Sequence, residues 1–128
     1  RDRGARVLVA NRTPEKAAEL GEPVEFTRRA MEEAADGAAL VVNATSLGMG
    51  TDTVPADLPL DALGDGTVAY DLVYRAGPTP WLRAAAHHGA RVVDGQGMLL
   101  HQGAVAFRQW TGHEPPLDAM RRGLDSAG

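Results

Sequence analysis

Cysteine is absent from this chain of 128 residues, and its absence removes several kinds of chemistry. Without a thiol there can be no disulfide, no thiolate metal site and no cysteine nucleophile. Long hydrophobic runs are also missing, because residues 38–42 form a typical run and a bilayer span needs ~20 apolar residues. Residues 1–4 do not have the composition of a signal peptide. We therefore expect a cytoplasmic protein that does not enter a membrane.

Several functional signatures are missing as well. The sequence has no paired histidine spacing for a metal, no nucleophile elbow and no Walker-type phosphate loop. Its net charge of -4 and the lack of a basic stripe give no support for binding to nucleic acid or to an anionic membrane surface. We expect neither a metal site nor a nucleic-acid partner.

The residues that are present predict one α/β domain. Hydrophobic residues make up 44% and charged residues 23%, which is ordinary for a globular protein. Short β-type runs alternate with helical patterns, and this order favours a Rossmann-like, doubly wound, mostly parallel sheet. Strands are expected at residues 6–10, 39–43, 67–72 and 91–93, helices at 14–20, 27–36, 80–88, 98–110 and 117–125, and a long loop at 51–65.

The strand ends are the expected place for a ligand. Ligands of doubly wound sheets bind at the carboxyl ends of the strands. All four expected strands run into polar or glycine-containing turns, at residues 11–13, 43–46, 71–74 and 94–95. We expect these turns to line one edge of the sheet, together with the C-terminal helices that follow the last of them.

The turn at residues 11–13 predicts the cofactor. An acidic residue here would bind the free ribose hydroxyl of NAD, whereas Arg12 offers a charged fork to the 2'-phosphate of NADP. Thr13 begins a helix, whose N-terminus favours an anion, and Lys16 adds a positive charge one turn later. The alternative is a capped helix start that carries two solvated charges.

Three further features have a functional and a structural interpretation. The small residues of 43–50 let backbone approach a flat ring or a ribose, or they form an ordinary polar loop. The phenol of Tyr74 binds a polyhydroxylated substrate, or it packs at the edge of the sheet. Gln102 shares a helical stripe with Met98, and its carboxamide binds a substrate hydroxyl or carboxylate, or is merely half-exposed.

Taken in order, these motifs resemble the C-terminal, NADP-binding half of the shikimate dehydrogenase family. The matching motifs are N-R-T-P-E-K (11–16), N-A-T-S-L-G-M (43–49), D-L-V-Y (71–74), T-P-W-L (79–82), D-G-Q-G-M-L-L-H-Q-G (94–103) and A-F-R-Q-W-T-G (106–112). Each motif is weak alone, but their order and spacing cover nearly the whole chain.

The resemblance implies an oxidoreductase that uses NADPH to reduce 3-dehydroshikimate to shikimate, in chorismate and aromatic amino acid biosynthesis. It implies cofactor contacts from eight residues: Asn11, Arg12, Thr13, Lys16, Thr45, Leu72, Gly95 and Met98. It also implies that Tyr74 and Gln102 reach the small-molecule substrate. We expect the intact protein to be a monomer or a homodimer.

Two parts of the family pattern are absent from this sequence. The family has a glycine-rich pyrophosphate loop before its second strand, and a catalytic Lys–Asp pair in an N-terminal domain. Lys16 is the only lysine here, and its place in the N-R-T turn excludes it as that acid/base. We therefore expect residues 1–128 to be a partial NADP-binding domain, truncated at its N-terminus, with no catalytic residue and no activity alone. Residues 98–128 would pack towards the missing substrate domain.

Two other functions remain open. A close relative could act on quinate or an aminated analogue, since the missing domain governs substrate choice. A non-catalytic NADP-binding module, such as a sensor or the remnant of a broken gene, belongs to a different class. The upstream sequence would distinguish an enzyme from a non-catalytic module, because a Lys–Asp pair and a glycine-rich loop would favour the enzyme.

Overall fold

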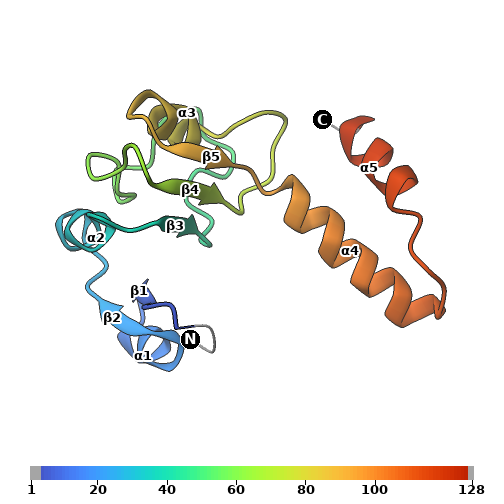
Figure 1. The fold of residues 1–128 in the computed structure, drawn as a ribbon, viewed down its shortest axis with the longest axis horizontal. Helices are drawn as coiled ribbons and strands as arrows, with labels where there is room; N and C mark the ends of the chain where they lie inside the picture. Colours follow the sequence, from blue (N-terminus) through green and yellow to red (C-terminus); the bar gives the residue numbers. More distant parts are fainter. Residues whose placement is uncertain (1–3, 127–128) are drawn as a thin grey trace.

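The computed structural model describes residues 4–126 and has the mixed α/β fold that the sequence predicts (Figure 1). The last two residues of the expected C-terminal helical region, 127 and 128, lie outside the described residues. In chain order the elements are β1 (Leu8–Ala10), α1 (Pro14–Leu20), β2 (Glu22–Val24), α2 (Arg28–Ala35), β3 (Leu40–Asn43), β4 (Val68–Asp71), α3 (Pro80–His87), β5 (Arg91–Val93), α4 (Gln96–Thr111) and α5 (Leu117–Ser126).

All the strand pairs are parallel, but the strands form two sheets where the sequence analysis expects one. β1 pairs with β2, and β3, β4 and β5 pair in that order. β2 was not expected, because it has only three residues and includes Pro23. Its strand character comes from its pairing with β1, and a proline is tolerated there because β2 has a neighbour on one side only.

Helix α1 packs closely on β1 and β2 because it ends at a glycine. Pro14 occupies the first helical position, as predicted, and Gly21 caps the C-terminus. A Cβ atom at Gly21 would lie 2.6 Å from the carbonyl oxygen of Val7 in the preceding segment. The absence of a side chain therefore brings the end of α1 against β1, and this fixes the turn at residues 11–13.

The main hydrophobic core lies between α3 and the three-stranded sheet. Trp81 and Leu82 of α3 are each 1% exposed and pack with Leu58, Leu63 and other buried residues. Thr79 caps α3, since its hydroxyl accepts a hydrogen bond from the backbone N–H of Leu82 at 3.3 Å. This core includes Ala69 of β4 and Ala90 just before β5, and it therefore anchors the sheet on which the strand ends lie.

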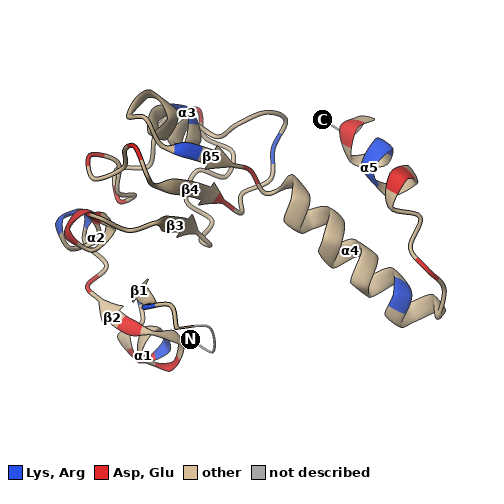
Figure 2. Cartoon of the chain, in the orientation of Figure 1, with Lys and Arg blue, Asp and Glu red and all other residues tan. Residues whose placement is uncertain are grey.

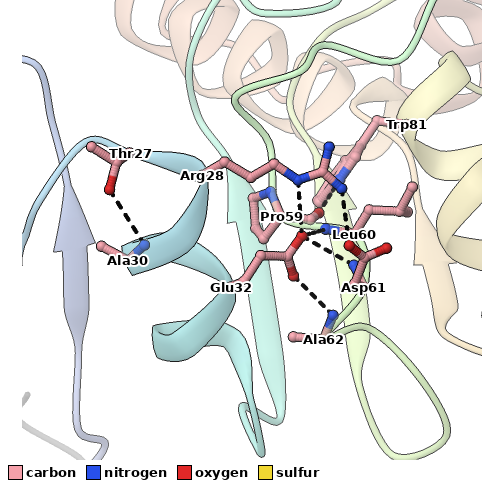
Figure 3. A network of polar contacts seen from close by, with 9 residues as sticks. All are labelled: Thr27, Arg28, Ala30, Glu32, Pro59, Leu60, Asp61, Ala62 and Trp81. Atoms are coloured by element: carbon pink, nitrogen blue, oxygen red, sulfur yellow. Dashed lines mark hydrogen bonds and ion pairs between the residues drawn. The ribbon is translucent and has the colours of Figure 1, made fainter.

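The long segment at residues 51–65 has no helix or strand, as predicted, but it is firmly attached to its neighbours. The carboxylate of Glu32 in α2 accepts hydrogen bonds from the backbone N–H groups of Leu60, Asp61 and Ala62, at 2.7, 3.1 and 2.8 Å (Figure 3). The indole N–H of Trp81 donates to the carbonyl oxygen of Pro59 at 2.7 Å. The segment therefore joins α2 to α3.

These contacts lower the pKa of Glu32. Burial acts to raise it, but the three backbone N–H groups and the Arg28 guanidinium, 3.5 Å away, outweigh that effect. A lowered pKa in the folded state means that the carboxylate stabilises the fold above the ordinary pKa of glutamate, about 4.3. That contribution is lost as the pH falls through the folded-state pKa.

The C-terminal part is a long helix, α4, which extends away from the three-stranded sheet, and α5, which runs back beside it (Figure 1). Only Leu100 and Ala104 of α4 are buried, and Arg108 is its single Lys, Arg, Asp or Glu residue (Figure 2). The exposed fraction of Trp110 is 84%. None of the helices in residues 4–126 has both the length and the apolar character that a membrane span requires.

We predict that Glu32→Gln lowers the free energy of unfolding at pH 7 by about 1.5–3 kcal/mol, the usual contribution of a hydrogen bond to a charged group. The loss should shrink as the pH falls below about 4.3 and through the lowered pKa of folded Glu32, because the wild-type side chain is then neutral, as glutamine is. Denaturant unfolding of both proteins between pH 3 and 7 measures this.

Glu33→Gln is the matched control on the same helix. Glu33 only forms an exposed ion pair with Arg29, so its loss should change the unfolding free energy little at any pH. Equal effects of the two substitutions would contradict the role of Glu32.

Candidate functional site

The turn after β1 is shaped by the side chain of Asn11. Its amide oxygen accepts a hydrogen bond from the backbone N–H of Thr13 at 2.8 Å, so that N–H is already engaged. Thr13 is the N-cap residue of α1, as predicted, but its side chain makes no capping hydrogen bond to the helix. The hydroxyl of Thr13 is therefore the group that this residue offers to a ligand.

Arg12 is exposed and lies over an aromatic ring. Its guanidinium carbon is 5.6 Å from the centroid of Phe26, just after β2, which is a cation–π distance. Within residues 4–126, Arg12 forms no ion pair, whereas Arg6, Arg28 and Arg75 each pair with a carboxylate. The ring orients the guanidinium while leaving its hydrogen-bond donors available.

Two adjoining cavities lie beside Arg12 and bring the first two turns together. The smaller one, about 180 Å³, is lined by Ala10, Asn11, Arg12, Phe26, Thr45, Ser46 and Leu47. The larger one, about 450 Å³, is lined by Asn11, Arg12, Pro14, Pro23, Val24, Glu25 and Phe26. Arg12 and Thr45 therefore face the same space although they follow strands of different sheets. Lys16 and Thr13 lie on the adjacent start of α1 and line neither cavity.

Phe26 and Ser46 are two of the lining residues that the sequence analysis did not name as site residues. Phe26 follows β2, the strand that was missed, so its place at a strand end could not be inferred. Ser46 lies inside the expected turn at residues 43–50 and is exposed. Nothing in the sequence distinguished it from the other small polar residues of that turn.

The turn after β3 is closed by hydrogen bonds to its own side chains. The amide oxygen of Asn43 accepts from the backbone N–H of Thr45 at 3.1 Å and from its hydroxyl at 2.7 Å. The Thr45 hydroxyl in turn accepts from the backbone N–H of Leu47 at 3.0 Å. Thr45 is thus presented to the cavity by a fixed backbone, with its hydroxyl already engaged.

A second group of expected cofactor residues gathers where β4 ends and α4 begins. A Cβ atom at Gly95 would lie 2.8 Å from the carbonyl oxygen of Leu72, so these two turns touch through backbone. Met98 follows in the first turn of α4 and is 43% exposed. A glycine is required at this contact, which is consistent with a site where a ligand meets backbone.

The two expected substrate residues belong to different elements. Tyr74 follows β4, and its hydroxyl donates to the carbonyl oxygen of Leu124 in α5 at 3.4 Å. Gln102 lies on α4 and is exposed. Neither residue lines the two cavities beside Arg12. No three His, Asp or Glu side chains gather into a metal site within the described range.

Comparisons with known proteins identify relatives along almost the whole chain. Residues 95–122 match the profile of the family described as "Shikimate 5'-dehydrogenase C-terminal domain". Shikimate dehydrogenase (NADP(+)) of Sinorhizobium medicae is 45% identical, over 95% of this chain and 44% of its own length. The chain thus spans less than half the length of the curated relatives it matches.

Solved structures agree with this match. Shikimate 5-dehydrogenase of Thermus thermophilus, in complex with NADP(H) and shikimate, has a TM-score of 0.80 at 36% identity, over 99% of this chain and 48% of that one. Quinate dehydrogenase of Corynebacterium glutamicum, in complex with NAD, has a TM-score of 0.78 at 31% identity, over 98% and 48%. The chain therefore corresponds to the C-terminal half of the shikimate dehydrogenase family, as its motifs predict.

Proposed function

We propose that this chain is the NADP-binding part of an NADP-dependent shikimate dehydrogenase, which reduces 3-dehydroshikimate to shikimate on the route to chorismate and the aromatic amino acids. Its relatives carry that name, and one of their structures holds both ligands. The observation within the chain that supports the proposal best is the exposed guanidinium of Arg12, which has no ion-pair partner among residues 4–126 and lines both cavities.

The residues around Arg12 fit the adenosine end of NADP. A guanidinium binds phosphate oxygens through two parallel hydrogen bonds, and its flat face also accommodates an adenine ring. The hydroxyl of Thr13 and the ammonium group of Lys16, both exposed at the start of α1, supply a further donor and a second positive charge. Asn11 and Thr45 border the same space, and Leu72, Gly95 and Met98 would contact the nicotinamide end.

When bound, NADPH supplies the hydride for the carbonyl of the substrate. In this chain, Tyr74 and Gln102 would hold substrate hydroxyl or carboxylate groups beside the strand ends. Reduction also needs an acid that protonates the new alkoxide, and Lys16 is too close to the phosphate site to serve. We infer that this acid belongs to an N-terminal domain of a longer protein, towards which α4 and α5 would pack, so that the chain alone would bind NADPH without turnover.

Quinate is the alternative substrate, because a quinate dehydrogenase shares this fold at 31% identity. That relative was solved with NAD, whereas Arg12 in this chain favours the phosphorylated cofactor. Rates of the full-length protein with shikimate and with quinate, each with NADP and NAD, distinguish the two enzymes. NADPH binding without any turnover by the full-length protein would favour a non-catalytic module.

We predict that Arg12→Ala weakens NADPH binding roughly 10- to 100-fold, because one charge-assisted contact is lost. NADH binding should change little, since NADH has no 2'-phosphate. Calorimetric titration of the chain with both cofactors measures this. Arg29→Ala, which removes an exposed side chain on α2, is the control and should change neither affinity. Equal losses for NADPH and NADH would remove Arg12 from the phosphate site.

Phe26→Leu should weaken NADPH binding about two- to fivefold, because an exposed cation–π contact contributes ~0.5–1 kcal/mol. If Phe26 acts by orienting Arg12, then Phe26→Leu should add nothing in an Arg12→Ala background. The same titrations on the single and double variants test this. Additive losses would show that Phe26 acts independently of Arg12.

Gln102→Ala should raise the KM of the full-length enzyme for its substrate roughly two- to tenfold, the usual effect of one lost hydrogen bond. The KM for NADPH should stay the same, because Gln102 lies away from both cavities beside Arg12. Gln109→Ala, an exposed glutamine two turns further along α4, is the control. A parallel loss for substrate and NADPH would indicate damage to the fold.

A further inference from the structure

A buried polar network lies where β3, β4 and α3 meet. The carboxylate of Asp71, the last residue of β4, is 0% exposed and has no ion-pair partner within residues 4–126. One of its oxygens accepts from the hydroxyl of Thr79 at 2.7 Å. The other accepts from the side-chain amide of Asn43 and from the backbone N–H of Val73, both at 3.0 Å. A buried carboxylate needs such donors, because its transfer from water is costly.

Asn43 carries the network into the neighbouring turn. It is the last residue of β3, it is 2% exposed, and it is the register partner of Asp71 in the parallel pair. Its amide nitrogen donates to the carbonyl oxygen of Leu47 at 3.0 Å as well as to Asp71, while its amide oxygen accepts from Thr45. The Asn43 side chain therefore uses its amide oxygen and one amide hydrogen to shape residues 43–47, and its other amide hydrogen to bind Asp71.

Two adjacent side chains thus fix two turns at once. Asn43 shapes the turn that presents Thr45 and Ser46 to the smaller cavity. Asp71 holds the N–H of Val73, and so fixes the turn that carries Leu72 and leads to Tyr74. Neither carboxylate oxygen is exposed, so Asp71 acts on a ligand only through the turns that it holds.

We propose that Asp71 and Asn43 are positioning residues for the cofactor and substrate site, because they lock the turns after β3 and β4 into one arrangement. This inference rests on the proposed function for its ligand, but the geometry of the turns can be tested without one. A buried ionic group is a weak source of net stability, and its better-attested use is to specify one conformation.

The first experiment compares Asn43→Ala with Thr79→Val. Each substitution removes one donor to the Asp71 carboxylate, but only Asn43 also holds Thr45 and Leu47. Asn43→Ala should raise deuterium exchange of the amides in residues 43–49 roughly tenfold or more and weaken NADPH binding by a similar factor. Thr79→Val should lower the melting temperature at least as much, yet leave exchange in 43–49 and NADPH affinity within about twofold of wild type.

Asp71→Asn and Asp71→Ala form the second comparison, and they keep the test valid if Asn43→Ala does not fold. An asparagine can place its oxygen towards Asn43 and Val73 and donate its amide to the Thr79 hydroxyl, so it should retain wild-type exchange in 43–49. Asp71→Ala should lose that protection. If Asp71→Asn raises exchange in residues 43–49 as much as Asp71→Ala does, the negative charge of Asp71 is what matters and the geometric role is wrong.

Two further results would overturn the proposal. In the first, Asn43→Ala and Thr79→Val raise deuterium exchange in residues 43–49 in the same proportion to their loss of melting temperature. The network would then contribute only to overall stability. The second is unchanged exchange in Asn43→Ala. Failure of the proposed function has a different signature: wild-type chain that does not bind NADPH, with the exchange pattern of the variants still as expected.

Discussion

The hydrogen bonds at the carboxyl end of β4 are the constraint on which the site depends. Parallel pairing brings Asn43 and Asp71 side by side, and the buried Asp71 carboxylate must then be satisfied by donors from three directions. Satisfying it aligns the turn after β3, the turn after β4 and the start of α3. Thr45 and Leu72 are therefore positioned by two side chains that line neither cavity beside Arg12.

A second carboxylate has a similar effect on the segment at residues 51–65. Glu32 binds three consecutive backbone N–H groups and so converts a segment rich in proline, aspartate and glycine into a fixed bridge between α2 and α3. The contrast with Arg12 is informative. Glu32 and Asp71 are satisfied by donors within the protein, whereas Arg12 lies over the ring of Phe26 and lines both cavities, which is the arrangement expected of a cation that binds a ligand.

The sequence predicts those parts of the fold that local chemistry determines. Pro14, Thr79 and Pro80 give the starts of α1 and α3, and the turn at Arg12 indicates the cofactor. Long-range partners could not be predicted: β2 is a strand only because it pairs with β1, and Glu32 resembles any exposed helical glutamate until the segment at 51–65 folds over it. The role of Phe26 was hidden for the same reason. Asn43 and Asp71 were visible as strand-end polar residues, but only the register shows that they meet.

The absence of a side chain at Gly21 affects the position of residues that Gly21 does not contact. A methyl group there would collide with the Val7 carbonyl oxygen and with a methyl group of Val9, 2.7 Å away, and relief would require α1 to move off β1. The turn that carries Arg12 connects those two elements, so such a movement would tilt the guanidinium although no residue that lines the two cavities had been substituted. Sequence variation among relatives should therefore be restricted at Gly21, although Gly21 lines neither of the two cavities and looks like an ordinary glycine at the end of a helix.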